Sequence, residues 1–228
     1  MENDAVLKTG TTTVGLRTAE GVVLAADRRA SLGGRFVSNK RAMKIEQVHP
    51  RAAVTMAGTV GGAQAFIRQL RAEANLYEAR RGRPMGLDAL AQTAGQLLRG
   101  TPASPVLGGV DVPTASAGRV GDDGRTGDDA DADADGTVEP RVFSIDGAGG
   151  VLEDAYTASG SGTTLATGAL ERGYREDLSL EEGVRAAAGA VASALERDTA
   201  SGNGITVARI TADGVTIDTH DDVREVLQ

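Results

Sequence analysis

The segment LKTGTTTVGL, residues 7–16, places three threonines directly after a glycine and at the start of a β-type run. Threonine is favoured in strands, so one interpretation is that these residues begin an edge strand. The other is that the chain is cut after Gly10, so that Thr11 becomes an N-terminus with an amine and a hydroxyl on one residue. Both interpretations start a strand here and differ only in the chemistry of its first residue.

Composition excludes several classes of protein. The 228 residues carry a net charge of −8, and residues 114–140 alone hold eight acidic residues against two arginines, whereas nucleic-acid binding requires a basic excess. Cysteine is absent, which excludes disulfides, thiolate metal sites and a cysteine nucleophile. No stretch has the length of a membrane span, and residues 1–10 lack the apolar core of a secretory signal. We therefore expect a cytoplasmic protein that binds neither nucleic acid nor membranes.

Hydrophobic periodicity predicts groups of strands that alternate with pairs of helices. Strands are expected at residues 11–17, 21–26, 52–57, 106–110, 142–145, 205–210 and 215–217. Helices are expected around residues 66–77, 87–97 and 165–175, and a fourth carries an apolar stripe at residues 184–195 after a capping box of Ser179 and Glu182. This order indicates an α+β fold rather than strict βα alternation, with two helix pairs available to cover the outer faces of a sheet sandwich.

Residues 114–139 interrupt this pattern. Their core, GDDGRTGDDADADADG, is rich in glycine and aspartate and has no apolar period. Such a composition cannot repay the entropy of ordering, so we expect a disordered acidic surface loop between two strands. A calcium loop is the alternative, but the glycine spacing and terminal glutamate of an EF-hand are missing.

A threonine hydroxyl is a weak nucleophile until a base removes its proton. An N-terminal amine on the same residue can be that base, because its ordinary pKa of roughly 7.7–8.0 is already close to neutral. For Thr11 this requires cleavage of the Gly10–Thr11 bond.

Three further residues could support such chemistry. Asp27 ends an apolar strand, and Lys44 stands between Met43 and Ile45, so a buried lysine paired with a carboxylate is one interpretation; ordinary surface charges are the other. Gly58 follows a predicted strand and precedes a helix, where backbone N–H groups can face a developing oxyanion. A phosphate-binding loop fits poorly, since the spacing is not G-x-G-x-x-G.

Two polar clusters, ASGSGTT at residues 158–164 and RDTASGNG at residues 197–204, precede a helix and the last strand pair respectively. By themselves they indicate turns. They contain Ser161, Asp198 and Ser201.

Taken together, the pieces TGTTTVGL, AADRRAS, KRAMKIEQV, TMAGTVGGAQAFIRQLRAE, GGVDVP, VFSIDGAGG, ASGSGTT and RDTASGNG, in this order, resemble a catalytic β subunit of the archaeal proteasome core particle. Only three of the 24 basic residues are lysines, which also resembles proteins of salt-loving archaea. The resemblance implies the four-layer αββα Ntn-hydrolase sandwich, two antiparallel sheets between helix layers. It also implies an N-terminal threonine endopeptidase that needs no cofactor and no metal.

The resemblance assigns roles residue by residue. It implies that residues 1–10 are a propeptide removed by self-cleavage between Gly10 and Thr11, and that residues 11–228 are the peptidase domain. Thr11 matches the nucleophile, Asp27 the acid beside the catalytic lysine, and Gly58 the oxyanion donor. Lys44 matches the lysine, with Lys40 as the alternative if the alignment shifts. The polar cluster that supports the free amine matches Ser161, Asp198 and Ser201.

Ala30 and Met56 match positions that line the pocket for the residue before the cleaved bond. Both are apolar, so we expect cleavage after hydrophobic residues, although Met56 is equally compatible with a core position. The two histidines, His49 and His220, have no third ligand nearby in the sequence, and we expect them to face solvent rather than bind a metal.

The resemblance also implies partners: other β subunits in a heptameric ring, α subunits that cap it, and a regulatory ATPase that feeds unfolded protein. Two alternatives are a structural β subunit without activity and a subunit of the bacterial two-part ATP-dependent peptidase. Silent members usually lose the threonine, the lysine or the processing glycine, and this chain keeps Thr11, Lys44 and Gly10.

Overall fold

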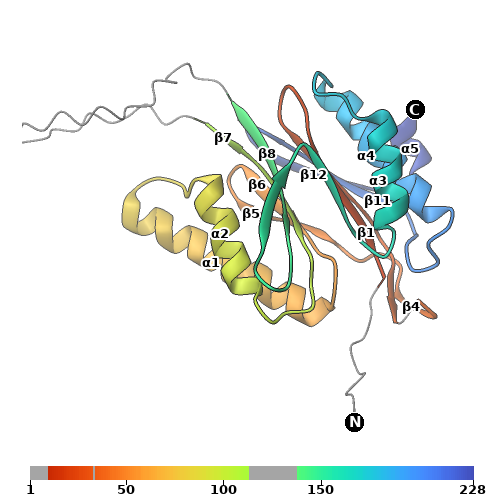
Figure 1. Cartoon of the computed structure of the whole chain (residues 1–228), viewed down its shortest axis with the longest axis horizontal. Coiled ribbons are helices and arrows are strands. Elements are labelled where there is room, and N and C mark those ends of the chain that lie inside the picture. The colour runs from red at the N-terminus through yellow and green to blue at the C-terminus, as the bar shows by residue number, and fades with distance from the viewer. Residues whose placement is uncertain (1–9, 33, 113–137) are drawn as a thin grey trace, which may run out of the picture.

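The computed structural model describes residues 10–32, 34–112 and 138–228. In these residues two five-stranded antiparallel sheets lie face to face (Figure 1). The first sheet has the order β10-β1-β2-β11-β12, with bounds β1 (Thr12–Arg17), β2 (Val22–Asp27), β10 (Tyr156–Gly160), β11 (Ile205–Thr211) and β12 (Gly214–His220). The second has the order β5-β6-β7-β8-β9, with bounds β5 (Ile45–His49), β6 (Ala52–Thr55), β7 (Val106–Asp111), β8 (Glu139–Ile145) and β9 (Val151–Asp154). A separate hairpin joins β3 (Ala30–Leu32) and β4 (Phe36–Asn39).

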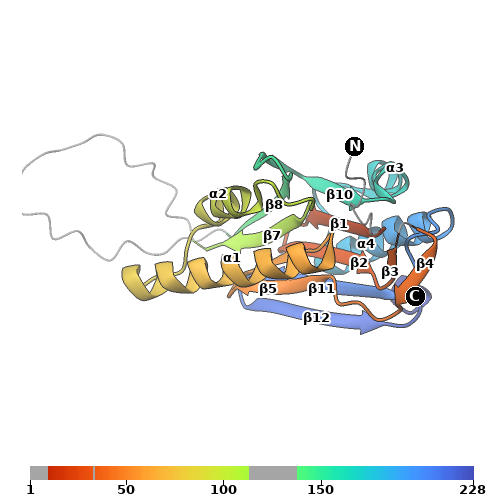
Figure 2. The same ribbon diagram turned by 90° about the horizontal axis from the view of Figure 1, so that it is seen from below.

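Helices cover both outer faces of this sandwich (Figures 1 and 2). The helices α1 (Val60–Arg81) and α2 (Leu87–Leu98) pack on the second sheet. The helices α3 (Thr163–Gly173) and α4 (Leu180–Leu195) pack on the first, and the short α5 (Arg224–Leu227) lies against α4. The α+β class and the four-layer αββα arrangement expected from the sequence are confirmed.

The central strand β2 explains why the layers form. All six of its residues are buried, because one face packs on the other sheet and the other face packs on helices. Val22 and Leu24 belong to the core between the sheets, while Val23 and Ala25 belong to the core beneath α3 and α4. Successive side chains of a strand point to opposite faces, so an uninterrupted apolar run is what a strand buried on both faces requires.

Small residues set the distance between the two sheets. A Cβ on Gly15 of β1 would stand 2.7 Å from Val106 Cγ1, and one on Gly108 of β7 would stand 2.6 Å from Val22 Cγ1. Non-bonded carbon atoms in contact are about 3.5–4.0 Å apart. A side chain at either position would therefore push the two sheets apart.

The structure corrects three expectations. Strand β8 begins at Glu139, so this residue lies in the sheet and not in the acidic loop; residues 113–137 lie outside the described part of the chain. Residues 158–160, read as a turn, belong to β10 and pair with β1. His49 does not face solvent: it is 6% exposed, its Nδ1 accepts a hydrogen bond from the Arg51 N–H (3.2 Å), and burial lowers its pKa to about 4.

Other expectations hold. Ser179 caps α4, and the reciprocal bonds between Ser179 and Glu182 form the capping box. His220 is partly exposed, with Nδ1 3.4 Å from Glu225 Oε2. Among the helices of the described residues, none combines the length and the apolar character that crossing a membrane requires.

Candidate active site

Strand alternation places Thr11 at the open end of the space between the sheets. Thr13 and Gly15 face the second sheet, since Thr55 Oγ1 donates a hydrogen bond to Thr13 Oγ1 (3.1 Å) and Gly15 lies against Val106. Thr11 continues this alternation two residues before Thr13, just outside β1, so its side chain lies on the same face.

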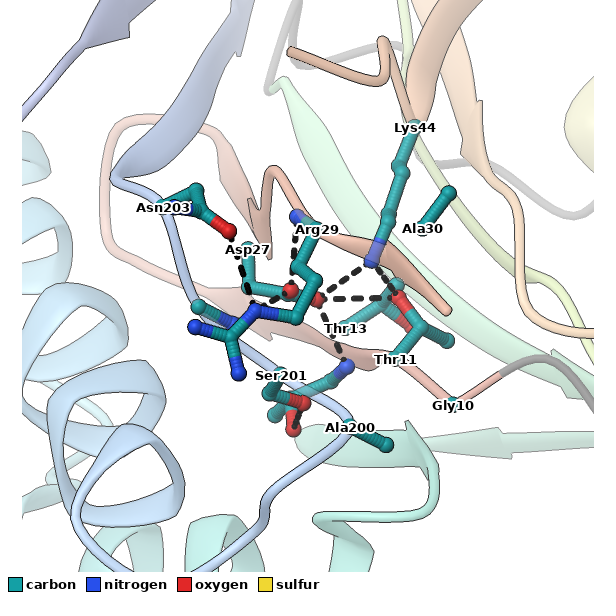
Figure 3. A network of polar contacts seen from close by, with 12 residues as sticks. Gly10, Thr11, Thr13, Asp27, Arg29, Ala30, Lys44, Ala200, Ser201 and Asn203 are labelled. Atoms are coloured by element: carbon teal, nitrogen blue, oxygen red, sulfur yellow. Dashed lines mark hydrogen bonds and ion pairs between the residues drawn. The ribbon is translucent and has the colours of Figure 1, made fainter. Parts of the chain in front are cut away.

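The pairing of β1 with β2 brings Asp27 to the same point. Thr13 stands opposite Ala26, so the next residue of β2, Asp27, meets the chain beside Thr12. The Thr12 N–H donates to Asp27 Oδ1 at 2.9 Å. Lys44 comes from the other sheet, directly before β5, and points toward the same oxygen (Figure 3).

Thr11, Asp27 and Lys44 form one contact group (Figure 3). The Thr11 hydroxyl donates to Asp27 Oδ1 at 3.0 Å, and the Lys44 ammonium donates to the same oxygen at 2.6 Å. Lys44 Nζ also contacts Thr11 Oγ1 directly. Lys40, the alternative lysine, is exposed and takes no part in this group. The hydroxyl of Thr11 therefore stands between a carboxylate and an ammonium group.

This group is removed from water. Asp27 is completely buried, Thr11 is 3% exposed and Lys44 is 6% exposed. Burial lowers the pKa of Lys44, and the attraction of Asp27 opposes that shift. Since the carboxylate compensates much of the cost of burying the ammonium, the ion pair can persist at a site where an isolated lysine would lose its proton.

The second oxygen of Asp27 is held by the backbone. Arg29 N–H donates to Asp27 Oδ2 at 3.0 Å, and Gly202 N–H donates to it at 2.8 Å. Oδ1 is thereby turned toward Thr11 and Lys44, and neither oxygen of this buried carboxylate lacks a donor.

Both Ser/Gly clusters of the sequence meet at Thr11. The Thr11 N–H donates to Ser161 Oγ (3.1 Å), and Ser161 Oγ donates to Asp198 Oδ2 (2.6 Å). Ser201 Oγ donates to the same carboxylate oxygen (2.7 Å) and shares a hydrogen bond with Thr12 Oγ1 (2.8 Å). Ser161 thus contacts the nitrogen of Thr11 directly, and Asp198 links Ser161 to Ser201.

Gly10 is confined by its neighbours. Its N–H donates to Ser31 Oγ at 3.3 Å. A Cβ at this position would stand 1.8 Å from the Cβ of Ala200 and 3.1 Å from Ser161 Oγ. Only a residue without a side chain fits here without a shift of the surrounding backbone.

A pocket of about 450 Å³ opens beside Thr11. Ala30 and Met56 both line it, and so does Gly58, which has a φ of 126° and lies between β6 and α1. At Gly58 a Cβ would stand 2.3 Å from the Pro102 carbonyl oxygen, so only glycine fits the backbone there.

The polar wall of this pocket was not predicted from the sequence. Arg41, Glu46 and Gln64 also line it, and Glu46 pairs with Arg71 of α1 at 3.0 Å. Arg41 follows β4, Glu46 lies in β5 and Gln64 lies in the first turns of α1. These three segments meet only in the folded chain, and no local sequence pattern indicates that they do.

Arg29 and Asn203 were not predicted as site residues either. The Arg29 side chain donates to Asn203 Oδ1 across the loop that carries Ser201. The signal that was present is the G-N-G triplet at residues 202–204, because asparagine between glycines is typical of a left-handed backbone position.

The chain is similar to known proteins over nearly its whole length. The sequence profile described as "Proteasome subunit" matches residues 7–113 and 132–210. "Proteasome subunit beta 2" of Haloterrigena turkmenica is 52% identical over 98% of this chain and 85% of its own length. "Proteasome subunit beta" of Natronomonas pharaonis is 52% identical over 98% and 84%, and that of Halomicrobium mukohataei is 52% identical over 97% and 84%. The chain belongs to the proteasome subunit family, and these relatives are β subunits of halophilic archaea.

Proposed function

We propose that this chain is a catalytic β subunit of the proteasome core particle, a threonine endopeptidase whose nucleophile is Thr11. One observation carries the proposal: the Thr11 hydroxyl lies between the Lys44 ammonium and the Asp27 carboxylate, beside an open pocket and directly after Gly10. Replacing a buried ion pair by apolar residues is often neutral or stabilising, so a pair kept in contact with a hydroxyl favours a chemical role over a purely structural one.

Self-cleavage is the first reaction in this proposal. The Thr11 oxygen attacks the Gly10 carbonyl carbon, while the hydroxyl proton leaves toward Asp27 Oδ1, 3.0 Å away. The bond between the Gly10 carbonyl and the Thr11 nitrogen breaks, the nitrogen takes up a proton beside Ser161, and an ester joins the two residues. Water then cleaves the ester, which releases residues 1–10 and leaves Thr11 with a free amine and a free hydroxyl.

Peptide hydrolysis repeats the same attack on a substrate. The amine of Thr11, now free, accepts the hydroxyl proton, directly or through a water. The ammonium of Lys44 favours the deprotonated hydroxyl by its charge. Gly58, in the wall of the pocket, is the proposed oxyanion donor. The acyl group is transferred to Thr11, the amine product leaves with a proton, and water regenerates the hydroxyl.

The pocket suggests the substrate. Ala30 and Met56 offer apolar contact to the residue before the cleaved bond, which favours hydrophobic residues there. As a core-particle subunit, the chain would assemble with other β subunits into a heptameric ring between α rings. Unfolded protein delivered by a regulatory ATPase in the cytoplasm would then be its substrate.

Intact mass of the purified protein tests the proposal, with wild type compared with Thr11→Ala and Thr11→Ser. Wild type is expected to lack the mass of residues 1–10, Thr11→Ala to retain it, and Thr11→Ser to be processed because it keeps a hydroxyl. Hydrolysis of a fluorogenic peptide is expected to follow processing. An unprocessed and inactive wild-type chain inside assembled particles would leave the structural-subunit alternative standing.

A further inference from the structure

The side chain of Arg29 crosses from the end of β2 to the loop at residues 198–204 (Figure 3). Its Nε donates to Asn203 Oδ1 at 2.9 Å, and its Nη1 donates to the Thr199 carbonyl oxygen at 2.8 Å. The guanidinium therefore joins both ends of the short segment that contains Ala200, Ser201 and Gly202.

Gly202 lies directly beneath this guanidinium. A Cβ on Gly202 would stand 2.3 Å from Arg29 Nη2 and 2.5 Å from its Cζ. The absence of a side chain at Gly202 is thus a condition for this close approach of the guanidinium to the backbone.

Asn203 has an uncommon backbone conformation. Its φ is 65°, and among the described residues it is the one non-glycine residue with a positive φ. Asparagine tolerates this region better than most residues. Glycine would tolerate it better still, so the backbone alone does not explain an asparagine between two glycines. The amide oxygen of Asn203, which accepts a hydrogen bond from Arg29, explains why an asparagine stands here.

The two segments that Arg29 joins are the same two that hold Asp27. Oδ2 of Asp27 accepts one hydrogen bond from the Arg29 N–H and one from the Gly202 N–H. Because both of these donors to Oδ2 come from the joined segments, we expect a change in their separation to move Oδ2 and to turn Oδ1 away from Thr11 and Lys44.

We propose that Asn203 is a positioning residue for the Thr11 hydroxyl. Through the Arg29 guanidinium it fixes the loop at residues 199–203 against the end of β2, and so orients the Asp27 carboxylate toward Thr11 and Lys44. The inference rests on the proposed function, in which the Thr11 hydroxyl is the nucleophile. The role of Asn203 is indirect, because Asn203 touches neither Thr11 nor the pocket that would receive a substrate.

The test compares Asn203→Gly with Asn203→Asp in the assembled particle, using a fluorogenic peptide. Asn203→Gly keeps the left-handed backbone and removes the acceptor. We expect kcat to fall about tenfold with KM unchanged, since a modest misplacement of reacting groups is costly. Asn203→Asp keeps an acceptor for Arg29 and is expected to recover most of that loss.

The pH profile separates positioning from mere stability. Asp198 also raises the pKa of Lys44 and Arg29 lowers it, both less than Asp27 acts on it. When Asp27 is displaced, it supports the Lys44 ammonium less, so the pKa of Lys44 falls further. The alkaline limb of kcat/KM is therefore expected to move to lower pH in Asn203→Gly. The control is Asn75→Gly on the exposed face of α1, which weakens a helix and should leave this limb unchanged.

A double-mutant cycle with Arg29→Met completes the test. If Asn203 acts through Arg29, adding Asn203→Gly to Arg29→Met costs nothing more. Additive effects, an unchanged kcat in Asn203→Gly, or a loss of stability without a shifted limb would each overturn the proposal. An inactive wild type would instead overturn the proposed function, so the two failures are distinguishable.

Discussion

A methyl group added at Gly10 should block self-cleavage. In Gly10→Ala the new Cβ would stand 1.8 Å from Ala200 Cβ, whereas carbon atoms in contact are about 3.5–4.0 Å apart. The Gly10 carbonyl must therefore move by about 2 Å relative to Ala200. A misplacement of about 1 Å at a reacting centre can cost ~10²-fold in rate, so we expect the Gly10–Thr11 bond to be cleaved at least ~10²-fold more slowly.

The structure also predicts a rescue. Removing the obstructing methyl with Ala200→Gly leaves the Ala200 Cα position at 3.0 Å and Ser161 Oγ at 3.1 Å as the nearest atoms to the new Cβ. Contacts of this length require the neighbouring atoms to shift by only a few tenths of an ångström. The double variant with Gly10→Ala and Ala200→Gly is therefore expected to undergo self-cleavage within about tenfold of the wild-type rate. This corresponds to a rise of at most about 1.4 kcal/mol in the activation free energy.

The assay follows the mass of newly made chains after cell-free synthesis, as the fraction that has lost residues 1–10 over time. Gly189→Ala is the matched control: it adds the same methyl to α4, where nothing lies within 4 Å of it. Wild-type kinetics in Gly10→Ala, or a double variant as slow as the single one, would refute the steric explanation.

Three further predictions concern other parts of the molecule. Lys44→Ala is expected to reduce peptide hydrolysis at least ~10²-fold, while Lys40→Ala, at an exposed lysine, leaves the rate unchanged; equal rates would exclude Lys44 from the chemistry. The pKa of His49 is about 4 in the folded chain and 6.5 ordinarily. Between pH 6.5 and pH 4 this imidazole is therefore protonated only in the unfolded chain, so the free energy of unfolding falls as the pH falls. The shift corresponds to about 3 kcal/mol at most, and urea unfolding of His49→Gln should show a smaller loss of stability between pH 6.5 and pH 4 than wild type. Met56→Ala is expected to lower kcat/KM about tenfold for a peptide with leucine before the cut and little for one with alanine; equal effects would argue against this pocket as the substrate site.

The sequence predicted those parts of the fold that bury an apolar face. The strand at β2 and the helix α4 carry regular apolar patterns, and α4 also has its capping box, so their positions follow from local rules. The positions of the strands β4, β9 and β10 do not follow from local rules. Residues of β4 and β9 are mostly exposed, and β10 is partly buried and ends in Ser-Gly, which by itself is typical of a turn. Their strand form comes from pairing with distant segments, and pairing leaves no local signal.

The site was predictable where chemistry and burial coincide. Lys44 beside Ile45, with Asp27 at the end of an apolar strand, suggested a buried ion pair from residue types alone, and the structure has that pair. The link between Arg29 and Asn203 was not predictable in this way, because the two residues are 174 positions apart and meet only through the order of β2 and β11 in the sheet. Likewise, the burial of His49 was not predicted, because it involves the backbone of Met85, which is distant in the sequence.

The site depends on the contact between the two sheets, because each sheet supplies part of it. Thr11 directly precedes β1 and Asp27 ends β2, so strand pairing in the first sheet fixes their relation. Lys44 directly precedes β5 of the second sheet, and only the packing between the sheets brings its ammonium to Asp27 Oδ1. The spacing of the sheets is set by glycines such as Gly15, where a side chain cannot fit. A methyl group at Gly15 would therefore act on Lys44 from a distance, by separating the layer that carries the ammonium from the layer that carries the hydroxyl.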